Sequence, residues 1–273
     1  MKRRAGSFTL HAALVLWGAA TLVPLLWMVS ASLMPSGQSL GLPPRFLPHP
    51  ATIVHYRELF TRLNIGRYLA NSAILATSVT LASVLFNSMA GYAFAKLRFR
   101  GRRRLLALLV ALMLVPAQIA MLPLFLLLKV LGLVNTLGGV IVPAMASVFG
   151  ILLVRQYAQS LSDDLLDAAR IEGAGEFRIY WSIVLPLCRP VLVTLAVFTF
   201  LATWNDFLWP LIVLTGDAHY TLPVALANLA GEHVQDTELM MAGSVLTILP
   251  VLVLFLAVQR YYLDGITLGS VKG

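Results

Sequence analysis

Charged side chains are scarce in this sequence. Asp, Glu, Lys and Arg make up 12% of the 273 residues, whereas a soluble domain carries roughly 25%. Hydrophobic residues make up 59% of the chain, and its mean hydropathy is +0.85. This composition excludes a chain built mainly of soluble domains and indicates an integral membrane protein.

Cysteine and phosphate-binding motifs are also lacking. Cys188 is the single cysteine, so no disulfide can form within the chain, and no Cys/His spacing is typical of a zinc site. The sequence has no Gly-Lys pair and therefore no G-x-x-x-x-G-K loop. We expect no metal site, no cofactor and no ATP hydrolysis by this chain.

What the sequence does contain is long apolar runs. A spanning helix needs about 20 apolar residues, and the N-terminal run is too long for the apolar core of a cleaved signal peptide. We predict an all-α integral membrane protein, a single transmembrane domain over residues 1–273. Six spanning helices are expected, at about 12–33, 69–95, 105–128, a stretch after the 132–139 turn that ends near Arg155, 190–214 and 240–262.

Prolines and polar residues separate these runs. Pro116 and Pro123 are expected to interrupt the third helix, because proline removes a backbone hydrogen bond and bends or breaks a spanning helix. A short interfacial helix is predicted at 55–60, and residues 215–238 are expected to form a loop.

The distribution of basic residues predicts the orientation. The strongest charge block is 96–104, KLRFRGRRR, which cytoplasmic segments favour. With the N-terminus inside, fifteen of the 20 Lys and Arg residues fall on the cytoplasmic side. Both termini and the 162–190 segment are then cytoplasmic. The net charge of +8 reflects this orientation, so no nucleic-acid partner is expected.

The 162–190 segment is the most polar long segment in a sequence that is otherwise mostly apolar. Ser162 is predicted to cap a helix that runs to Glu172, with two aspartates in its first turn. Leu165, Ala168, Ala169 and Glu172 would share one flank of this helix. Gly173 stands where a helix ends in a left-handed turn.

A second short helix is predicted from Glu176, and Leu185-Pro186 is expected to stop it before the membrane. The product is a short helix held by a glycine corner, with small alanines that let another surface approach closely. The residues alone leave open the alternative of an amphipathic loop that packs against its own bundle.

The spacing within this segment resembles a known motif. Asp167-Ala168-Ala169, three residues, Gly173, nine residues and Ile183-Val184-Leu185-Pro186 are similar to the EAA loop of permease subunits in binding-protein-dependent (type I) ABC importers. Asp167 stands where the family usually has Glu. The resemblance implies that residues 67–262, which hold the second to sixth expected helices and the 162–190 loop, form an ABC transmembrane type-1 core. It also implies contact with an ATPase subunit through Asp167, Ala168, Ala169, Gly173, Ile183, Leu185 and Pro186.

Other segments resemble the MalG-like sugar permeases: 68–72, 115–118 with 131–133, 204–206, and 269–273. This resemblance implies a sugar importer in the bacterial plasma membrane. Its implied partners are a second homologous permease, two ATPase subunits, an extracytoplasmic solute-binding protein and membrane lipid. The C-terminal residues Gly269, Lys272 and Gly273 would reach towards the ATPases.

Asp206 is the only acid that falls within an expected spanning segment, with Asn205 beside it, and Asn87 and Gln118 are amides in the second and third expected helices. A central acid costs about 2.5–3.5 kcal/mol to insert, so these side chains should face the bundle or a cavity. They either line a sugar pathway or tie neighbouring helices together.

Two alternative functions remain open on the sequence. A permease for glycerol-3-phosphate or a polyol is one, although no Lys or Arg falls in the interior of an expected span, away from its ends, to hold a phosphate. An ion-coupled secondary transporter is the other, and it would usually have midplane titratable groups and an internal repeat. A membrane scaffold would not need proline-broken helices around polar residues.

Overall fold

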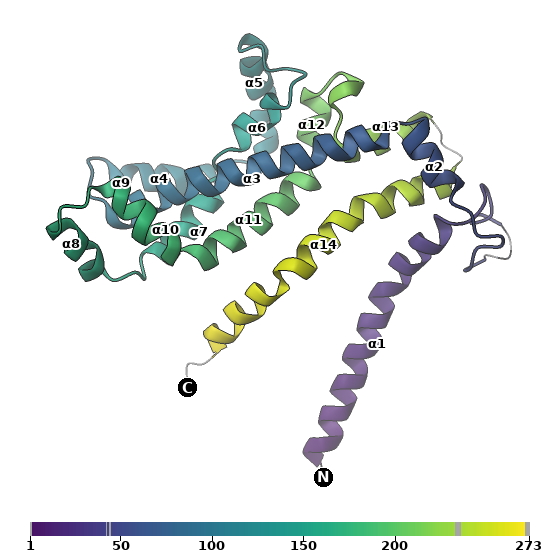
Figure 1. The fold of residues 1–273 in the computed structure, drawn as a ribbon, viewed down its shortest axis with the longest axis horizontal. Helices are drawn as coiled ribbons and strands as arrows, with labels where there is room; N and C mark the ends of the chain where they lie inside the picture. The colour runs from purple at the N-terminus through teal and green to yellow at the C-terminus, as the bar shows by residue number, and fades with distance from the viewer. Residues whose placement is uncertain (1, 42, 44, 233–235, 271–273) are drawn as a thin grey trace. The chain divides into compact units, whose positions relative to one another are not determined.

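The computed structural model describes residues 2–41, 43, 45–232 and 236–270, and every regular element within them is helical. The chain forms two compact units, Met1–Gly66 with Ala225–Leu252, and Arg67–Val224 with Val253–Gly273. In chain order (Figure 1) the helices are α1 (Lys2–Ala31), α2 (Val54–Thr61), α3 (Ile65–Lys96), α4 (Arg102–Leu112), α5 (Ala117–Val130), α6 (Gly138–Ala144), α7 (Val148–Ala158), α8 (Asp163–Ile171), α9 (Glu176–Ile179), the π-helix η1 (Tyr180–Val184), α10 (Leu185–Leu187), α11 (Arg189–Trp204), α12 (Leu208–Val213), the 3₁₀-helix η2 (Asp217–His219), α13 (Leu222–Glu232) and α14 (Thr237–Ser270).

The predicted all-α membrane fold agrees with these helices. Among the described residues, four stretches are long and apolar enough to cross a membrane: Leu10–Ala31, Ile65–Lys96, Gly138–Ala158 and Thr237–Gln259. Two further pairs qualify when each bent pair counts as one span. α4 and α5 meet at 105°, and the α9–α10 segment meets α11 at 79°. Six spans result, four continuous and two bent.

The third predicted helix is broken at only one of its two prolines. α4 ends at Leu112, and Pro116 precedes α5, as expected. Pro123, in contrast, lies inside α5, which continues to Val130, so the second predicted interruption is wrong. A proline removes one donor, and here the 14-residue helix continues through it without a break.

The fifth predicted helix is shorter than expected. α11 ends at Trp204 and α12 starts at Leu208, because polar side chains bind the backbone at the break. Asn205 donates to the Leu201 carbonyl at 2.8 Å, and Asp206 accepts from the backbone N–H groups of Phe207, Leu208 and Trp209. The predicted 190–214 helix is therefore two helices.

The predicted loop at 215–238 is also wrong, since α13 lies within it. Leu222 and Val224 in this helix are fully buried. The segment was predicted to be a loop because it has four acidic residues and no Lys or Arg. Burial of its apolar side chains nevertheless stabilises a helix.

In the first unit, a fully buried acid holds a loop. Glu238 lies in α14 with no exposed surface, and its carboxylate accepts the backbone N–H of Gly37 at 3.0 Å and of Ser39 at 2.7 Å. Nearby, His55 of α2 is paired with the Met34 carbonyl at 2.9 Å. The sequence predicted that Asp206 is the only acid within a spanning segment. Glu238 lies within the candidate span Thr237–Gln259, so that prediction is wrong.

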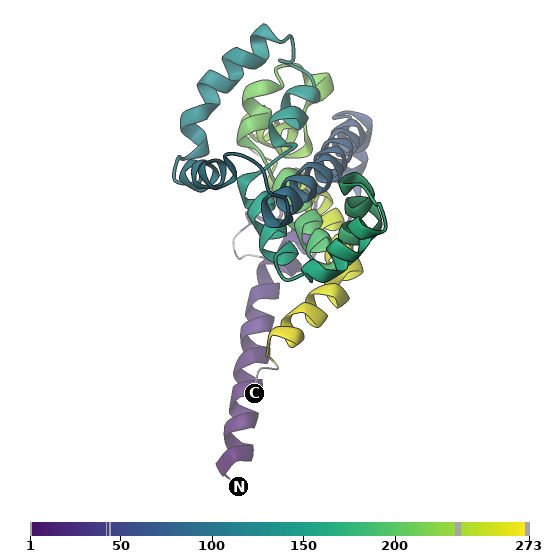
Figure 2. The same cartoon turned by 90° about the vertical axis from the view of Figure 1, so that its left-hand side faces the viewer.

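The second unit has two buried clusters. One joins α3, α7, α8, the α9–α10 segment and α11, and the other joins α3, α5, α6 and α12. α3 and α7 approach closely at Gly91, where a Cβ atom would lie 2.8 Å from the Val154 Cβ. Figures 1 and 2 show α8 and α9 beside the end of α3. The first cluster thus connects the 162–190 segment to the spanning helices.

Candidate functional site

The site begins at α8, which starts where the sequence predicts. Asp163 and Asp164 occupy its first turn, where acids interact favourably with the helix dipole. Ser162 is at the N-cap position, but its side chain makes no capping hydrogen bond, so that prediction is wrong. Asp163 is instead engaged with a lysine from another helix.

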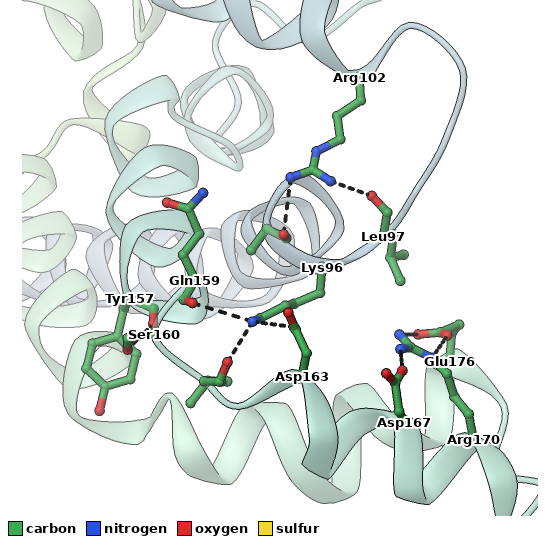
Figure 3. A network of polar contacts seen from close by, with 12 residues as sticks. Lys96, Leu97, Arg102, Tyr157, Gln159, Ser160, Asp163, Asp167, Arg170 and Glu176 are labelled. Carbon is green, nitrogen blue, oxygen red and sulfur yellow. Dashed lines mark hydrogen bonds and ion pairs between the residues drawn. The ribbon is translucent and has the colours of Figure 1, made fainter.

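That lysine is Lys96, the last residue of α3. Its ammonium donates to Asp163 Oδ1 at 2.7 Å and to the Leu161 carbonyl at 2.6 Å, and its side chain is only 6% exposed. The Lys96 hydrogen bond and charge hold the pKa of Asp163 below its usual range. Lys96 therefore attaches the start of α8 to the end of α3 (Figure 3).

The end of α8 is a glycine corner of the Schellman type. Gly173 has φ +86°, a conformation that glycine adopts without steric cost. Its N–H donates to the Arg170 carbonyl, and the Ala174 N–H donates to the Ala169 carbonyl, both at 3.0 Å. These two bonds satisfy the last carbonyls of the helix, and they confirm the predicted left-handed turn.

A set of side chains braces this corner, and we call Asp167, Arg170, Glu176 and Tyr92 the corner bracket. Arg170 donates to Asp167 Oδ1 at 2.6 Å and to Glu176 Oε1 at 2.7 Å (Figure 3). The Tyr92 hydroxyl of α3 donates to Glu176 Oε2 at 2.6 Å. Hydrogen bonds to Glu176 and then Asp167 raise the pKa of Arg170 further above its usual range, so the guanidinium stays charged.

The two faces of α8 differ from the sequence prediction. Leu166 is buried at 1% exposure, and Ala169 packs against the same cluster. Leu165, Ala168 and Ile171 point outwards, and Ile171 is 87% exposed. We therefore correct the predicted flank: Ala169 belongs to the inner face, three residues after Leu166, and Ile171 joins the outer face.

The second short helix continues further than predicted. It passes from α9 through the π-helix η1 into α10 and ends at Leu187, beyond Pro186. The Leu185 N–H donates to the Tyr180 carbonyl, five residues earlier. A wider turn here accommodates Pro186, whose ring would clash with a carbonyl in a regular α-helix, so Leu185-Pro186 does not stop the helix.

The later motif residues mostly face the chain's own core. Ile183 and Leu185 are half-buried against the first cluster, whereas Pro186 is exposed. Tyr180 is buried in that cluster, and its hydroxyl is 2.7 Å from Ser88 Oγ of α3. The motif therefore combines an exposed helix with a buried support.

The four polar residues of the spanning segments have separate surroundings. Asn87 is fully buried; it donates to Ser83 Oγ at 2.6 Å and accepts the Ser147 N–H at 2.9 Å. Gln118 is exposed in the first turn of α5. Asn205 and Asp206 bind the local backbone at the α11–α12 break. No hydrogen bond found in the described part of the chain joins these three places.

The remaining predicted site residues lie at the C-terminus. Gly269 falls within α14, and Lys272 and Gly273 lie outside the described residues. Among the residues that the structure describes, no group of three His, Cys, Asp or Glu side chains could hold a metal ion.

Sequence reasoning missed Lys96, Arg170, Tyr92 and Ile171. One signal was present for Arg170: acids lie three residues before it and six residues after it. The contacts of Lys96 and Tyr92 join residues more than 60 positions apart in sequence, and local spacing cannot reveal such pairs.

Known proteins resemble this chain over nearly its whole length. It is 40% identical over 253 residues to the arabinooligosaccharides transport system permease protein AraQ of Halalkalibacterium halodurans, covering 92% of this chain and 91% of the relative. It is 33% identical to the diacetylchitobiose uptake system permease protein NgcG of Streptomyces coelicolor, with 96% and 88% covered.

A solved structure has the same fold. It is described as a bacterial ABC transporter involved in the import of the acidic polysaccharide alginate; the TM-score is 0.83 at 26% identity, with 95% of this chain and 97% of that chain covered. The family model for the inner membrane component of binding-protein-dependent transport systems matches residues 84–266. Such a component is a non-catalytic permease of an ABC importer, and it works with a solute-binding protein and with separate ATPase subunits. The chain therefore belongs to the family of inner membrane components of binding-protein-dependent transport systems, as a multi-pass permease subunit of the inner membrane.

Proposed function

We propose that this chain is one of two permease subunits of an importer for a mono-, di- or oligosaccharide. The observation that carries the proposal is the similarity, over more than 90% of the chain, to permeases of the arabinooligosaccharide and diacetylchitobiose systems. The proposed complex contains a second homologous permease, two ATPase subunits and an extracytoplasmic solute-binding protein. Glycerol-3-phosphate or a polyol is the alternative substrate.

The 162–190 segment is proposed to be the coupling loop, within a 67–262 permease core. An exposed helix face made by Leu165, Ala168 and Ile171 supports this assignment, because a small residue between two apolar ones suits docking in a cleft. Asp167 faces solvent on the same helix. Gly173 holds the corner, Ala169, Ile183 and Leu185 provide the support behind the contact, and the exposed Pro186 belongs to the proposed contact itself.

The proposed mechanism follows from the attachments of α8. ATP binding would close the two ATPase subunits and displace α8 on the cytoplasmic side. Lys96 and the corner bracket join α8 to α3, and Leu166 joins it to the buried cluster with α7 and α11. Displacement of α8 is thereby passed to the spanning helices, which switch between inward- and outward-facing states.

Sugar contact is proposed for the polar residues that remain accessible. Gln118 and Asn205 are exposed in this subunit, and Asp206 lies beside Asn205. Asn87 has both its amide and its carbonyl engaged by protein groups, so it would reach a sugar only if the contact of α3 with α7 opened. The tail at Gly269, Lys272 and Gly273 is proposed to contact the ATPases.

Replacement of Gly173 tests the coupling assignment. In the assembled complex, Gly173→Val should abolish most uptake and most binding-protein-stimulated ATP hydrolysis, since a β-branched residue is strained by about 1–3 kcal/mol at positive φ. Gly132→Val is the matched control: Gly132 also has positive φ, +68°, and open space around its Cβ position. Equal behaviour of the two variants would refute the assignment of the coupling loop.

The substrate is tested separately. The solute-binding protein encoded beside this chain should retain a saccharide after purification, which mass spectrometry identifies. Competition for uptake should then follow the same saccharide. A bound glycerol-3-phosphate or polyol would replace the sugar assignment and leave the coupling assignment unaffected.

A further inference from the structure

A basic hollow lies where the turn before α4 meets α7. Its volume is about 700 Å³, and it is lined by Phe99, Gly101, Arg102, Arg103, Arg104, Leu106 and Arg155. Four of these seven lining residues are arginines and none is acidic. We call the space that these seven residues line the basic hollow. The positive-inside bias explains why arginines occur in this turn, but it does not require that they converge with an arginine from another helix.

The arginines of the basic hollow differ in the hydrogen bonds that they make within the chain. Arg102 binds the backbone of its own chain: it donates to the Leu97 carbonyl at 3.0 Å and to the Ala95 carbonyl at 3.2 Å (Figure 3). Arg155 arrives from α7, and its Nε is buried with no hydrogen-bond partner within the described residues. A buried donor left unpaired costs free energy, so an acceptor from outside the chain would satisfy it.

Arg103 and Arg104 are exposed at the first turn of α4. No ion pair of either is present among the described residues. Guanidinium groups bind phosphate oxygens through paired N–H donors. Arg103, Arg104 and Arg155 together therefore favour a phosphate-bearing ligand.

The other wall of the basic hollow is apolar. Phe99 and Leu106 form this wall, and Phe99 is 39% exposed. Leu105 and Leu108 belong to α4 outside the lining and are 47% and 55% exposed. α4 is the first half of a bent membrane span, so its exposed leucines lie where acyl chains would be. A ligand that uses both walls has an anionic head and an apolar tail.

We propose that the basic hollow binds the phosphate headgroup of an anionic phospholipid, with its acyl chains along α4. Basic pockets at the end of spanning helices are suited to such headgroups. The basic hollow shares no lining residue with those proposed for sugar contact or with the exposed face of α8, and the proposal does not depend on which solute is transported. Its bound lipid would join the turn before α4 to α7.

The test uses the full-length chain, purified in detergent and titrated with phosphatidylglycerol or phosphatidylcholine, with bound lipid counted by native mass spectrometry. We expect about tenfold tighter binding of phosphatidylglycerol. The variant Arg103→Gln/Arg104→Gln/Arg155→Gln should reduce this preference to about twofold or less. A control with the same charge change, Arg45→Gln/Arg57→Gln/Arg62→Gln, should keep the full preference.

Two other outcomes would overturn the proposal. Equal loss in the control variant would indicate a general charge effect rather than a site. Displacement of phosphatidylglycerol by equimolar inorganic phosphate would indicate a free-phosphate site that ignores the apolar wall.

A second measurement covers the case in which the triple variant does not fold. A photoactivatable phosphatidylglycerol, added to the unmodified chain in vesicles of phosphatidylglycerol and phosphatidylcholine, should label peptides that contain residues 99–108 and 151–155. Labels confined to other peptides would refute the lipid site.

Discussion

Two loops of this molecule are each held by acidic side chains, yet the two attachments differ in kind. In the first unit, Glu238 has no exposed surface and accepts two backbone N–H groups from the loop at Gly37–Ser39. In the second unit, the ion pairs of the corner bracket remain open to water, with Glu176 45% and Asp167 61% exposed, and only the Tyr92 member is buried.

This difference in exposure sets how easily each loop can move. A buried acceptor that loses its donors is expensive, whereas an exposed ion pair contributes about 0–1 kcal/mol. The loop at Gly37–Ser39 is therefore a fixed part of its unit. The corner at Gly173 has a definite geometry, and its ion pairs can be replaced by water or by a partner protein, which would suit the movement proposed for the coupling loop.

The largest effect is expected at Glu238. Glu238→Ala should lower the free energy of unfolding by about 3 kcal/mol, because two backbone donors lose a charged acceptor. Thermal unfolding followed by tryptophan fluorescence measures this change. Glu58→Ala, which removes an exposed pair with Arg62 at 3.2 Å, is the control and should change it by about 0.5 kcal/mol or less. Similar melting temperatures for the two variants would contradict the comparison.

A smaller change in stability, with a larger change in function, is expected at Arg170. Arg170→Ala removes both ion pairs of the corner bracket and should destabilise the chain by about 1 kcal/mol or less. Uptake by the assembled complex should fall about fivefold while ATP hydrolysis continues, since α8 loses a link to α3. Arg178→Ala, an exposed arginine of the same loop, should have no effect. Full uptake with Arg170→Ala would show that the corner bracket is not needed.

Asp167→Glu restores the residue usual in the family and should change uptake by about twofold or less. Asp167 already bonds Arg170 at 2.6 Å within its own helix, and a longer side chain at the same i,i+3 spacing can keep this pair. Transport assays with purified complexes measure the effect. A tenfold change in either direction would mean that Asp167 makes a length-dependent contact with the ATPase.

The smallest effect concerns pH. Lys96 lowers the pKa of Asp163, so the pair contributes stability above the ordinary aspartate pKa of about 3.9 and loses it as the pH falls through the lower folded value. The difference in melting temperature between the unmodified chain and Asp163→Asn should stay constant from about pH 5 to pH 8 and shrink below about pH 4. A difference that varies between about pH 6 and pH 8 would contradict this assignment.

The sequence predicted the features that depend on local chemistry. Gly173 and Pro116 mark the corner and the bend because their backbone requirements are local, and the apolar runs marked the spans. Pro123 and Pro186 were misread, because whether a helix continues past a proline depends on its surroundings. The contacts of Lys96, Arg170 and Tyr92 join distant segments, so only the fold could reveal them.

The nine residues between Gly173 and Ile183 run into the π-helix η1. A π turn holds one more residue than an α turn, and each residue of an α-helix rotates the next side chain by about 100°. The extra residue therefore sets the direction in which Leu185 and every later side chain of α10 points. The direction of the half-buried Leu185 side chain therefore depends on the number of residues before it as well as on their chemistry.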